Sequence, residues 1–471
     1  MPSSDLYVFS SFASFGLHRL MMQHSVAHGR MSVALYTGTN ERDYQRIQAD
    51  IAELGIKVLF FEGIVEAQPF PSLLASLPEI INSNFIKMVC FLLLKEPRNA
   101  FGLRRLFARR KAAARKVLVE QEITAVVCSE DGISGDLPFF TVASEIGIPV
   151  IDVPYGNATE YDFDVSLRQR EREGAIILPG GKTLGLLKIF ARNWLKKNTY
   201  PNAILFQPEY IMALESLDIT LDNAWIVHGG RSDILCAENK VATRQYLAEG
   251  IPREKIRETG TPYCDVIFGS LPVPNVSGVK LLRPEKINSH ETRILVSWPP
   301  SYHETYPGAS EFDSYLNMSR KIFEFLRSLP NTNLTVSLHP ACDPEVLGLL
   351  RELEINVSEE YVVSLIAKHD VFTTYFSSTI RWALACGVPV INYDAYRLNL
   401  KAYDDAPGFK NAESFDVYSQ MIENITSNNE LYVDLSSKQI DNASEWGVLD
   451  GKNIERIFAE VDSLKSERAR S

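Results

Sequence analysis

Residues 124–153, TAVVCSEDGISGDLPFFTVASEIGIPVIDV, carry the pattern that decides the fold. The stretch begins with a short apolar, β-branched run (Thr124–Ser129), continues with a helical pattern (Phe139–Ile146) and ends with a second apolar run (Pro149–Val153). Two short buried strands joined by a helix predict a βαβ unit, in which the strands are parallel and the helix covers the sheet.

The same alternation extends over most of the chain. In the N-terminal half it predicts further strands at residues 6–11, 32–37, 57–61 and 224–230. It stops in the stretch Leu271–Asn288, where proline, glycine and serine occur without a period, and then restarts. In the C-terminal half it predicts strands at residues 293–298, 334–340, 371–376 and 389–394. We therefore predict an α/β fold of two Rossmann-like domains, residues 1–275 and 288–471, that face each other across a cleft.

Composition narrows the classes of protein that remain. With 45% hydrophobic and 23% charged residues among 471, the chain is typical of a globular protein with two large domains. Its net charge of −11 argues against nucleic-acid binding, which needs a broad basic surface. The six cysteines form no CxxC pair and lie in apolar settings, which fits reduced core residues in the cytoplasm. The N-terminus lacks a signal-peptide pattern, and the longest apolar run, Met88–Leu94, is far short of the roughly 20 residues that span a bilayer.

An acidic pair follows the strand predicted at residues 124–129. Open parallel sheets bind ligands at the carboxyl ends of their strands, so Glu130 and Asp131 stand where a catalytic group is expected. Two adjacent carboxylates can raise one another's pKa, which suits a general base, and Gly132 permits a turn close to a ligand. A solvated acidic turn with a helix cap is the structural alternative.

Polar residues also follow two strands that begin the C-terminal half. The pair His339-Pro340 offers an imidazole that can donate a hydrogen bond to a phosphate, in a loop that the proline fixes. Ser301 lies in the loop after the first strand of this half, where a nucleotide is commonly held. A structural histidine and a rigid proline turn are the respective alternatives.

The run Ser377-Ser378-Thr379 stands between a predicted strand and a helix. Hydroxyls together with the backbone N–H groups at a helix N-terminus form an anion site. Capping of the helix favours the same residue types but needs only one of them, so three in a row favour phosphate binding.

These features resemble the two-domain glycosyltransferase architecture called GT-B. The run Thr259-Gly260-Thr261-Pro262 with Asp265 resembles the TGxPxxD turn that ends the first domain of many such enzymes and of the non-hydrolysing UDP-N-acetylglucosamine 2-epimerases. Bacterial sialyltransferases and polysialyltransferases have three short motifs, which this chain resembles, in the same order, at Glu130-Asp131-Gly132, His339-Pro340 and Ser377-Ser378.

The resemblance implies an inverting transfer of a sialic-acid-like or related ulosonic acid from a CMP donor to a glycan or glycoconjugate acceptor. In the N-terminal domain, Asp131, or less favourably Glu130, would deprotonate the acceptor hydroxyl, with Ser11 and Gly132 on the acceptor side. In the C-terminal domain, the nucleotide and its phosphate would be held by His339, which also stabilises the leaving phosphate, and by Pro340, Ser377, Ser378, Thr379 and Ser301. Because CMP leaves with a single phosphate, neither a metal ion nor another cofactor is expected.

Three other functions stay open. A UDP-N-acetylglucosamine 2-epimerase would share the strand–loop–helix–strand plan of residues 124–156, but Pro154 stands where those enzymes carry a glutamate, and Arg381-Trp382 replace their ribose-binding glutamates. Enzymes that use CDP-glycerol or CDP-ribitol also combine a histidine–proline motif with a serine pair. A non-catalytic sensor of nucleotide sugars could have the same fold.

Two basic stretches suit an anionic partner. Arg98–Lys116 and Gly185–Asn198 alternate basic with apolar residues, and the second places Lys188, Arg192 and Lys196 four apart on one face of a predicted helix. Both could rest on an anionic membrane surface, which would place a cytoplasmic protein at the inner membrane, or hold an anionic acceptor glycan. A solvated helix face is the alternative.

Overall fold

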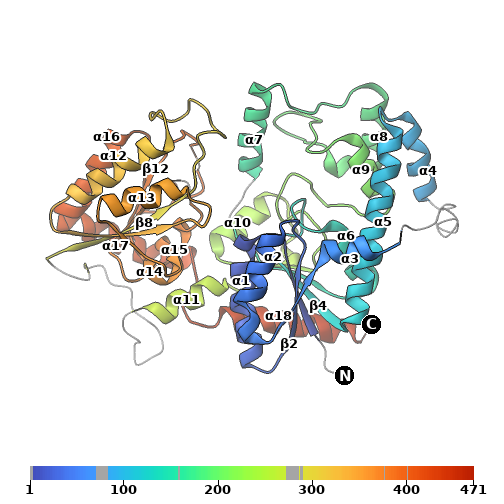
Figure 1. Cartoon of the computed structure of the whole chain (residues 1–471), viewed down its shortest axis with the longest axis horizontal. Helices are drawn as coiled ribbons and strands as arrows, with labels where there is room; N and C mark the ends of the chain where they lie inside the picture. Colours follow the sequence, from blue (N-terminus) through green and yellow to red (C-terminus); the bar gives the residue numbers. More distant parts are fainter. Residues whose placement is uncertain are drawn as a thin grey trace. The chain divides into compact units, whose positions relative to one another are not determined.

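The computed structural model describes residues 4–69, 83–156, 160–271, 286, 290–375, 377–399 and 401–470. The chain divides into two compact units: unit 1 comprises Met1–Ala237, Thr243–Arg257 and Glu455–Ser471, and unit 2 comprises Glu238–Ala242 and Glu258–Ile454. Each unit is built on one sheet with helices packed against it (Figure 1). Nearly all of the predicted linker lies outside the described residues, so the boundaries at residues 275 and 288 stay a prediction.

The sheet of unit 1 has seven strands in the order β3-β2-β1-β4-β5-β6-β7. Its strands are β1 (Ser4–Phe9), β2 (Met31–Tyr36), β3 (Lys57–Phe60), β4 (Ile123–Cys128), β5 (Val150–Asp152), β6 (Ile234–Ala237) and β7 (Ile256–Glu258). The pairs from β3 to β6 are parallel. The chain builds outward from β1 to β3 and then crosses to β4 on the other side of β1. The strand order therefore reverses between β1 and β4, which is where open α/β sheets bind ligands.

The sheet of unit 2 has six strands in the order β10-β9-β8-β11-β12-β13, paired in parallel throughout. Its strands are β8 (Thr292–Trp298), β9 (Thr332–Leu338), β10 (Asn356–Val357), β11 (Val371–Thr374), β12 (Val390–Tyr393) and β13 (Phe409–Ala412). Here the order reverses between β8 and β11. The α/β architecture with two Rossmann-like units is thus confirmed.

Helices connect the strands of both units. In the first part of the chain they are α1 (Phe12–Ala27), α2 (Glu41–Asp50), α3 (Phe61–Ala67), α4 (Ser83–Val89), α5 (Pro97–Glu120), α6 (Leu137–Glu145), α7 (Glu160–Arg172), α8 (Gly181–Phe190), α9 (Pro208–Glu215) and α10 (Lys240–Ala248). They continue with α11 (Pro262–Ser270), α12 (Tyr315–Ser328), α13 (Pro344–Glu352), α14 (Val362–Ile366), α15 (Ile380–Ala385), α16 (Phe415–Ser427), α17 (Asn429–Asn442) and α18 (Asn453–Arg468). No helix of the described ranges is long and apolar enough to cross a membrane.

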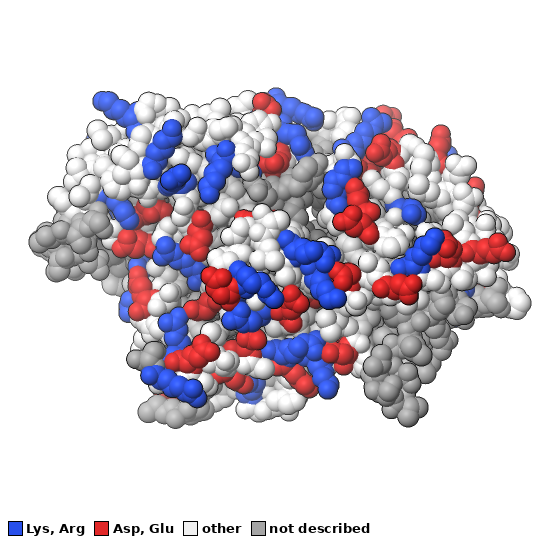
Figure 2. Space-filling model, turned by 180° about the vertical axis from the view of Figure 1, so that it is seen from behind, with Lys and Arg blue, Asp and Glu red and all other residues white. Residues whose placement is uncertain are grey.

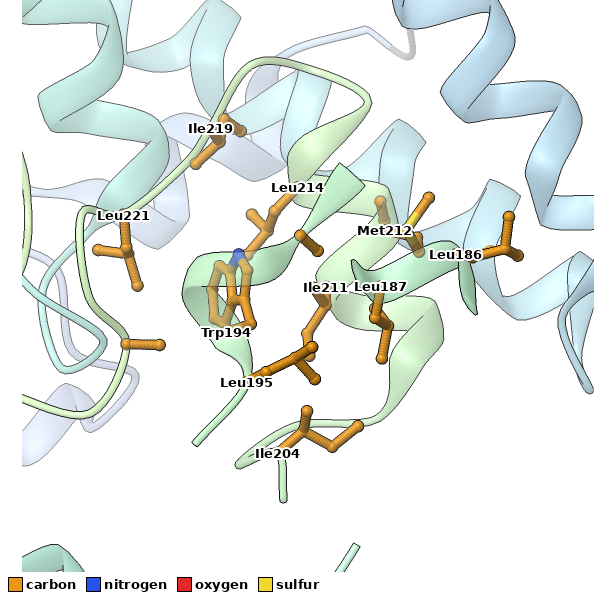
Figure 3. Close-up of a cluster of buried hydrophobic side chains, with 14 of the residues drawn as sticks. Leu186, Leu187, Trp194, Leu195, Ile204, Ile211, Met212, Leu214, Ile219 and Leu221 are labelled. Carbon is orange, nitrogen blue, oxygen red and sulfur yellow. The ribbon is translucent and has the colours of Figure 1, made fainter. Parts of the chain in front are cut away.

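Besides the core formed by its strands and the helices on them, unit 1 has a second hydrophobic core. It gathers apolar side chains of α5, α8 and α9, and Figure 3 shows Trp194 among Leu195, Ile211 and Leu214. The indole of Trp194 donates to Glu215 at 2.8 Å, which satisfies the polar end of a side chain that is otherwise enclosed.

This core overturns one prediction about the basic stretches. The prediction of a single amphipathic helix over Gly185–Asn198 is wrong, because α8 ends at Phe190 and the side chain of Trp194 is buried in this core. Lys196 is buried and pairs with Asp164 at 3.0 Å, so it cannot share an exposed face with Lys188. Ion pairs also account for several cations of the other basic stretch, Arg98–Lys116. In it, Arg110, Lys111 and Arg115 of α5 bind carboxylates of unit 1.

The strand predicted at residues 224–230 is also wrong. The segment is a buried loop that closes on itself, since the backbone N–H groups of Asp222 and Asn223 both donate to the carbonyl of Gly229, at 2.8 and 3.0 Å. The strand of this region, β6, begins later at Ile234. An apolar run that is buried on all sides has the same sequence signature whether it forms a strand or a packed loop.

Candidate functional site

The carboxyl ends of β1, β2 and β4 form a hollow at the place where the strand order of unit 1 reverses. Phe9 and Ser10 line it from the end of β1, Thr37 from the end of β2, and Glu130 from the end of β4. Ser134, in the turn after β4, lines it as well. Open parallel sheets bind ligands at this position.

Two carboxyl groups line the hollow, Glu130 and Asp136. Asp136 is paired with Arg110, so Glu130 is the candidate for acid–base chemistry. Burial raises the pKa of its carboxyl to about 7, even though the nearby His228 and hydrogen bonds from Ser134 and Tyr155 favour the ionised form. The side chain is only partly buried, so a ligand can reach it. A carboxyl that titrates near neutral pH can both accept and return a proton, which general acid–base chemistry requires.

Asp131 has a different environment from its neighbour. Its carboxylate is fully buried and accepts hydrogen bonds from the N–H of Gly230 at 3.0 Å, from the N–H and hydroxyl of Ser232 at 2.9 and 2.7 Å, and from the ammonium of Lys255 at 2.9 Å. Burial alone would raise the pKa of Asp131, but Lys255 and Ser232 outweigh it and lower the pKa to about 2. These contacts make Asp131 an anchor for the loop over residues 228–232, and they favour Glu130 as the base.

A buried imidazole–carboxylate pair lies behind this acidic turn. His228 Nδ1 and Asp152 Oδ2 are 2.7 Å apart, and Asp152 also accepts from the N–H of Asp131 at 3.2 Å. Burial alone would lower the pKa of His228, but the charge of Asp152 raises it above its ordinary value. When His228 is protonated, it supplies positive charge close to Glu130, which favours ionisation of that carboxyl.

Asp131, Asp152 and His228 also have the spacing of a metal site, because one potential ligand atom of each lies within 4.8 Å of the others. The ammonium of Lys255 already binds Asp131 at 2.9 Å, and it supplies the positive charge that a cation would bring. The donor set is therefore better explained as an internal ion-pair network than as a metal centre.

The two residues predicted on the acceptor side have structural contacts. Ser11 caps α1, and its hydroxyl accepts from the N–H of Ser14 at 3.2 Å. Gly132 is buried and donates its N–H to Val227 at 3.1 Å, and a Cβ there would lie 2.2 Å from the same carbonyl oxygen. Gly132 thus lets the turn carrying Glu130 pack against the loop of His228, whereas Ser10 lines the hollow.

In unit 2, the predicted hydroxyls lie at the corresponding edge of the sheet. Ser377 and Thr379 are joined by a 2.7 Å hydrogen bond between their hydroxyls, and Thr379 reaches Ser297, in β8, at 3.5 Å. Ser378 is exposed between them. The helix that follows, α15, begins at Ile380 and has six residues, so its dipole adds little to an anion site.

His339 lies on the same edge, directly after β9. Its ring Nδ1 accepts from the N–H of Ala341 at 3.1 Å, and the backbone N–H of His339 donates to the carbonyl of Trp298 at 2.9 Å. Partial burial lowers the pKa of the imidazole, so the neutral ring carries its proton on Nε2 at pH 7. The residue as a whole is exposed, and Nε2–H is a donor suited to a phosphate oxygen. Pro340 is exposed beside it.

The loop that carries Ser301 is held by tyrosines. The hydroxyl of Tyr375 donates to the carbonyls of Pro299 and Pro300, at 2.8 Å each, and Tyr315 donates to Pro299 at 2.6 Å. Ser301 itself is exposed and accepts from the N–H of His303 at 3.3 Å. The structure thus brings the C-terminal candidates to one edge of one sheet, and the N-terminal candidates to one edge of the other.

Comparisons with known proteins place this geometry in a known fold. No protein-family model matches the chain, and no curated protein matches it in sequence. Among solved structures, the UDP-GlcNAc 2-epimerase of Neisseria meningitidis bound to UDP-GlcNAc is similar over 97% of this chain and 100% of its own, with 13% identity and a TM-score of 0.51. The calicheamicin glycosyltransferase is similar over 99% of both chains, with 12% identity and a TM-score of 0.51. The wall teichoic acid polymerase TagF, soaked with CDPG, is similar over 99% of this chain and 90% of its own, with 11% identity and a TM-score of 0.50.

The chain has the GT-B fold. Two features singled out in the sequence, the TGxPxxD turn and Arg381, have structural explanations here. Asp265 of the TGxPxxD turn accepts from the N–H groups of Asn453 and Ile454, at 3.0 and 2.8 Å, and so caps α18. Arg381, which stands where the epimerases carry a ribose-binding glutamate, is buried and pairs with Glu238 at 2.5 Å.

The sequence did not reveal several residues of this site. Lys255 binds Asp131, Tyr155 is hydrogen-bonded to Glu130, and His228 binds Asp152 behind the acidic turn. The only local signal was the dipeptide Gly229-Gly230 after His228. A Cβ at Gly230 would lie 1.9 Å from the carbonyl oxygen of Asp131, so this glycine marks a close approach of two backbone segments.

Proposed function

We propose that this protein is a glycosyltransferase that moves a sugar from a nucleotide-activated donor to the hydroxyl of a glycan or glycoconjugate, with Glu130 as the general base. One observation carries the proposal: Glu130 lines the hollow where the strand order of unit 1 reverses, and its pKa is raised to about 7. A base poised near neutral pH can accept the proton of an attacking hydroxyl and release it afterwards.

The donor is assigned to the carboxyl edge of the sheet in unit 2. His339 offers an Nε2–H donor there, and Ser377, Ser378 and Thr379 offer hydroxyls beside the ends of β8 and β11. Hydrogen bonds from these groups would bind the nucleotide phosphate and stabilise the charge that develops as it leaves. The order of the short motifs supports a CMP-activated ulosonic acid and an inverting reaction without a metal ion.

The test is a donor panel. Purified protein is mixed with CMP, CDP, UDP and GDP in thermal-shift experiments, and then with the sugar derivatives of the nucleotide that stabilises it most. We expect CMP to give the largest shift and mass spectrometry to detect a glycosylated acceptor. A shift with UDP alone would reject the cytidine donor, and hydrolysis or transfer of none of the donors would reject the transferase.

A second function is supported by the fold of the epimerases. A 2-epimerase needs groups that remove and return a proton at one carbon, and Glu130 and the His228–Asp152 pair are titratable groups close to one another. Incubation with UDP-GlcNAc in D₂O, without an acceptor, distinguishes the two activities. Incorporation of deuterium at the epimerised carbon would establish the epimerase, whereas transfer that requires an acceptor would establish the glycosyltransferase.

Two further activities are outcomes of the same panel. Release of CMP from CDP-glycerol or CDP-ribitol, with transfer of the polyol phosphate, would indicate the phosphotransferase. Binding of a nucleotide sugar with release of no nucleotide would indicate a sensor. The raised pKa of Glu130 favours chemistry over sensing, because a site that only binds gains nothing from a carboxyl held half-protonated.

A further inference from the structure

One surface of unit 1 exposes an unusual density of large apolar side chains. Within nine consecutive residues of α4 and the short 3₁₀ helix that follows it (Cys90–Leu93), five such side chains are 42% to 67% exposed: Phe85, Ile86, Val89, Leu92 and Leu93. We call these five residues the apolar face. Contiguous exposed apolar surface of this kind marks an interaction site more often than scattered single residues do.

The apolar face is held firmly from behind. Phe91 and Leu94, which belong to the same segment of the chain, are buried in the second core of unit 1. Lys87 donates to the carbonyl of Glu215 at 2.8 Å and pairs with Asp218 at 3.1 Å, so its ammonium is turned toward α9. The segment is therefore docked by one side, and its other side is presented outward as a built surface.

Exposed basic side chains lie on the segments next to the apolar face. The short helix of residues 90–93 packs against α5 and α8. These two helices and the residues within two positions of their ends carry Ile189, which is 71% exposed, and six exposed cations. None of the six has an acidic partner within the described part of the chain; they are Lys95, Arg98, Arg105, Lys182, Lys188 and Arg192. Figure 1 shows α4, α5 and α8 at one corner of unit 1, and Figure 2, from behind, shows Lys and Arg side chains gathered at that corner.

We propose that the apolar face and its six cations dock unit 1 on an anionic lipid surface. Leucine, isoleucine and phenylalanine side chains would enter the boundary between headgroups and acyl chains, while the cations bind the lipid phosphates. The charge argues against a second copy of the chain as the occupant. An isologous contact would place the same cations opposite one another, where they repel. The proposal is independent of the reaction catalysed.

Vesicle flotation tests the proposal on the full-length protein. We expect the wild type to float with vesicles of phosphatidylglycerol in phosphatidylcholine and to stay in solution with phosphatidylcholine alone. Raising the ionic strength above about 0.15 M, where the Debye length falls below about 8 Å, should release it from the vesicles. Each cation near an anionic surface contributes about fivefold to binding, so Lys188→Gln with Arg192→Gln should weaken partitioning about 25-fold.

The apolar contribution is tested by Leu92→Ser with Leu93→Ser, which should abolish flotation. The matched control is Val119→Ser with Val417→Ser, because these side chains are 63% and 42% exposed but lie outside the apolar face. Circular dichroism confirms that each variant folds. Equal flotation of all variants, or none by the wild type at low salt, would overturn the proposal. The proposal would also be overturned if the wild type forms a dimer that dissociates in the variant with Leu92→Ser and Leu93→Ser.

Discussion

Replacing Glu130 with glutamine tests the base and its environment together. The amide keeps the shape of the side chain and removes its ability to accept a proton. General-base catalysis contributes about 10²–10⁴-fold, so turnover should fall by that factor, equivalent to about 3–5 kcal/mol in the barrier. The matched control is Glu53→Gln, which changes an exposed carboxylate outside the hollow and should leave the rate unchanged.

The pH dependence follows from the raised pKa of Glu130. With a pKa of about 7, the carboxyl is ionised in about one tenth of molecules at pH 6 and about nine tenths at pH 8. Since only the ionised form is a base, kcat/KM should rise with pH and level off above pH 8, and Glu130→Gln should remove the inflection near pH 7.

The same substitution should stabilise the fold at alkaline pH. A carboxyl whose folded-state pKa is raised from 4.5 to about 7 destabilises the protein as it ionises, beginning above pH 4.5 and reaching its full effect above pH 7. The shift corresponds to at most about 3 kcal/mol, and solvent screening of a partly exposed group reduces it, so Glu130→Gln should raise the free energy of unfolding by about 1–3 kcal/mol at alkaline pH. A variant that keeps the wild-type rate and pH profile would refute the assignment, whatever its stability.

Three further predictions concern the packing behind the site, and urea unfolding measures each of them. Asp131→Asn leaves Lys255 buried without its counter-charge, so it should cost about 3–5 kcal/mol of unfolding free energy; an unchanged midpoint would contradict the anchoring role. His18 is fully buried, and burial lowers its pKa from 6.5 to about 3. The fold should therefore lose stability as pH falls below 6.5, and His18→Leu should lessen that loss. Equal acid sensitivity in the wild type and the variant would show that another group is responsible. Gly230→Ala should destabilise the fold severely, because its Cβ would lie 1.9 Å from a carbonyl oxygen. The control Gly102→Ala in α5 meets open space and should raise the free energy of unfolding by about 0.5–1 kcal/mol. Similar effects from both variants would argue against the close approach at Gly230.

The fold could be predicted from the sequence because its signals are local. Each predicted strand of the two sheets except residues 224–230 overlaps an observed strand, since a buried parallel strand is a short apolar run with polar boundaries. The run at 224–230 failed for the same reason, because a loop buried on all sides has the same composition. The prediction over Gly185–Asn198 failed because the core that encloses Trp194 overrides the helical period.

The site could be predicted only in part. Its position followed from the rule that ligands bind at the carboxyl ends of strands, and Glu130, His339 and the hydroxyl run lie there. The choice between Glu130 and Asp131 could not be made, because it depends on Lys255, 124 residues from Asp131, and on His228, 76 residues from Asp152. Distant partners thus lower the pKa of Asp131, whereas burial raises the pKa of the adjacent Glu130.

Acceptor-dependent release of nucleotide is the sharpest test of Glu130 as the general base of a transfer reaction. The wild type, Glu130→Gln and Glu53→Gln are each incubated with the preferred nucleotide sugar, with and without a glycan acceptor, and free nucleotide is measured over time. We expect release that requires the acceptor, is equal for the wild type and Glu53→Gln, and is slower by about 10²-fold or more for Glu130→Gln. Release at one common rate in all three proteins, or release that ignores the acceptor, would contradict this role of Glu130.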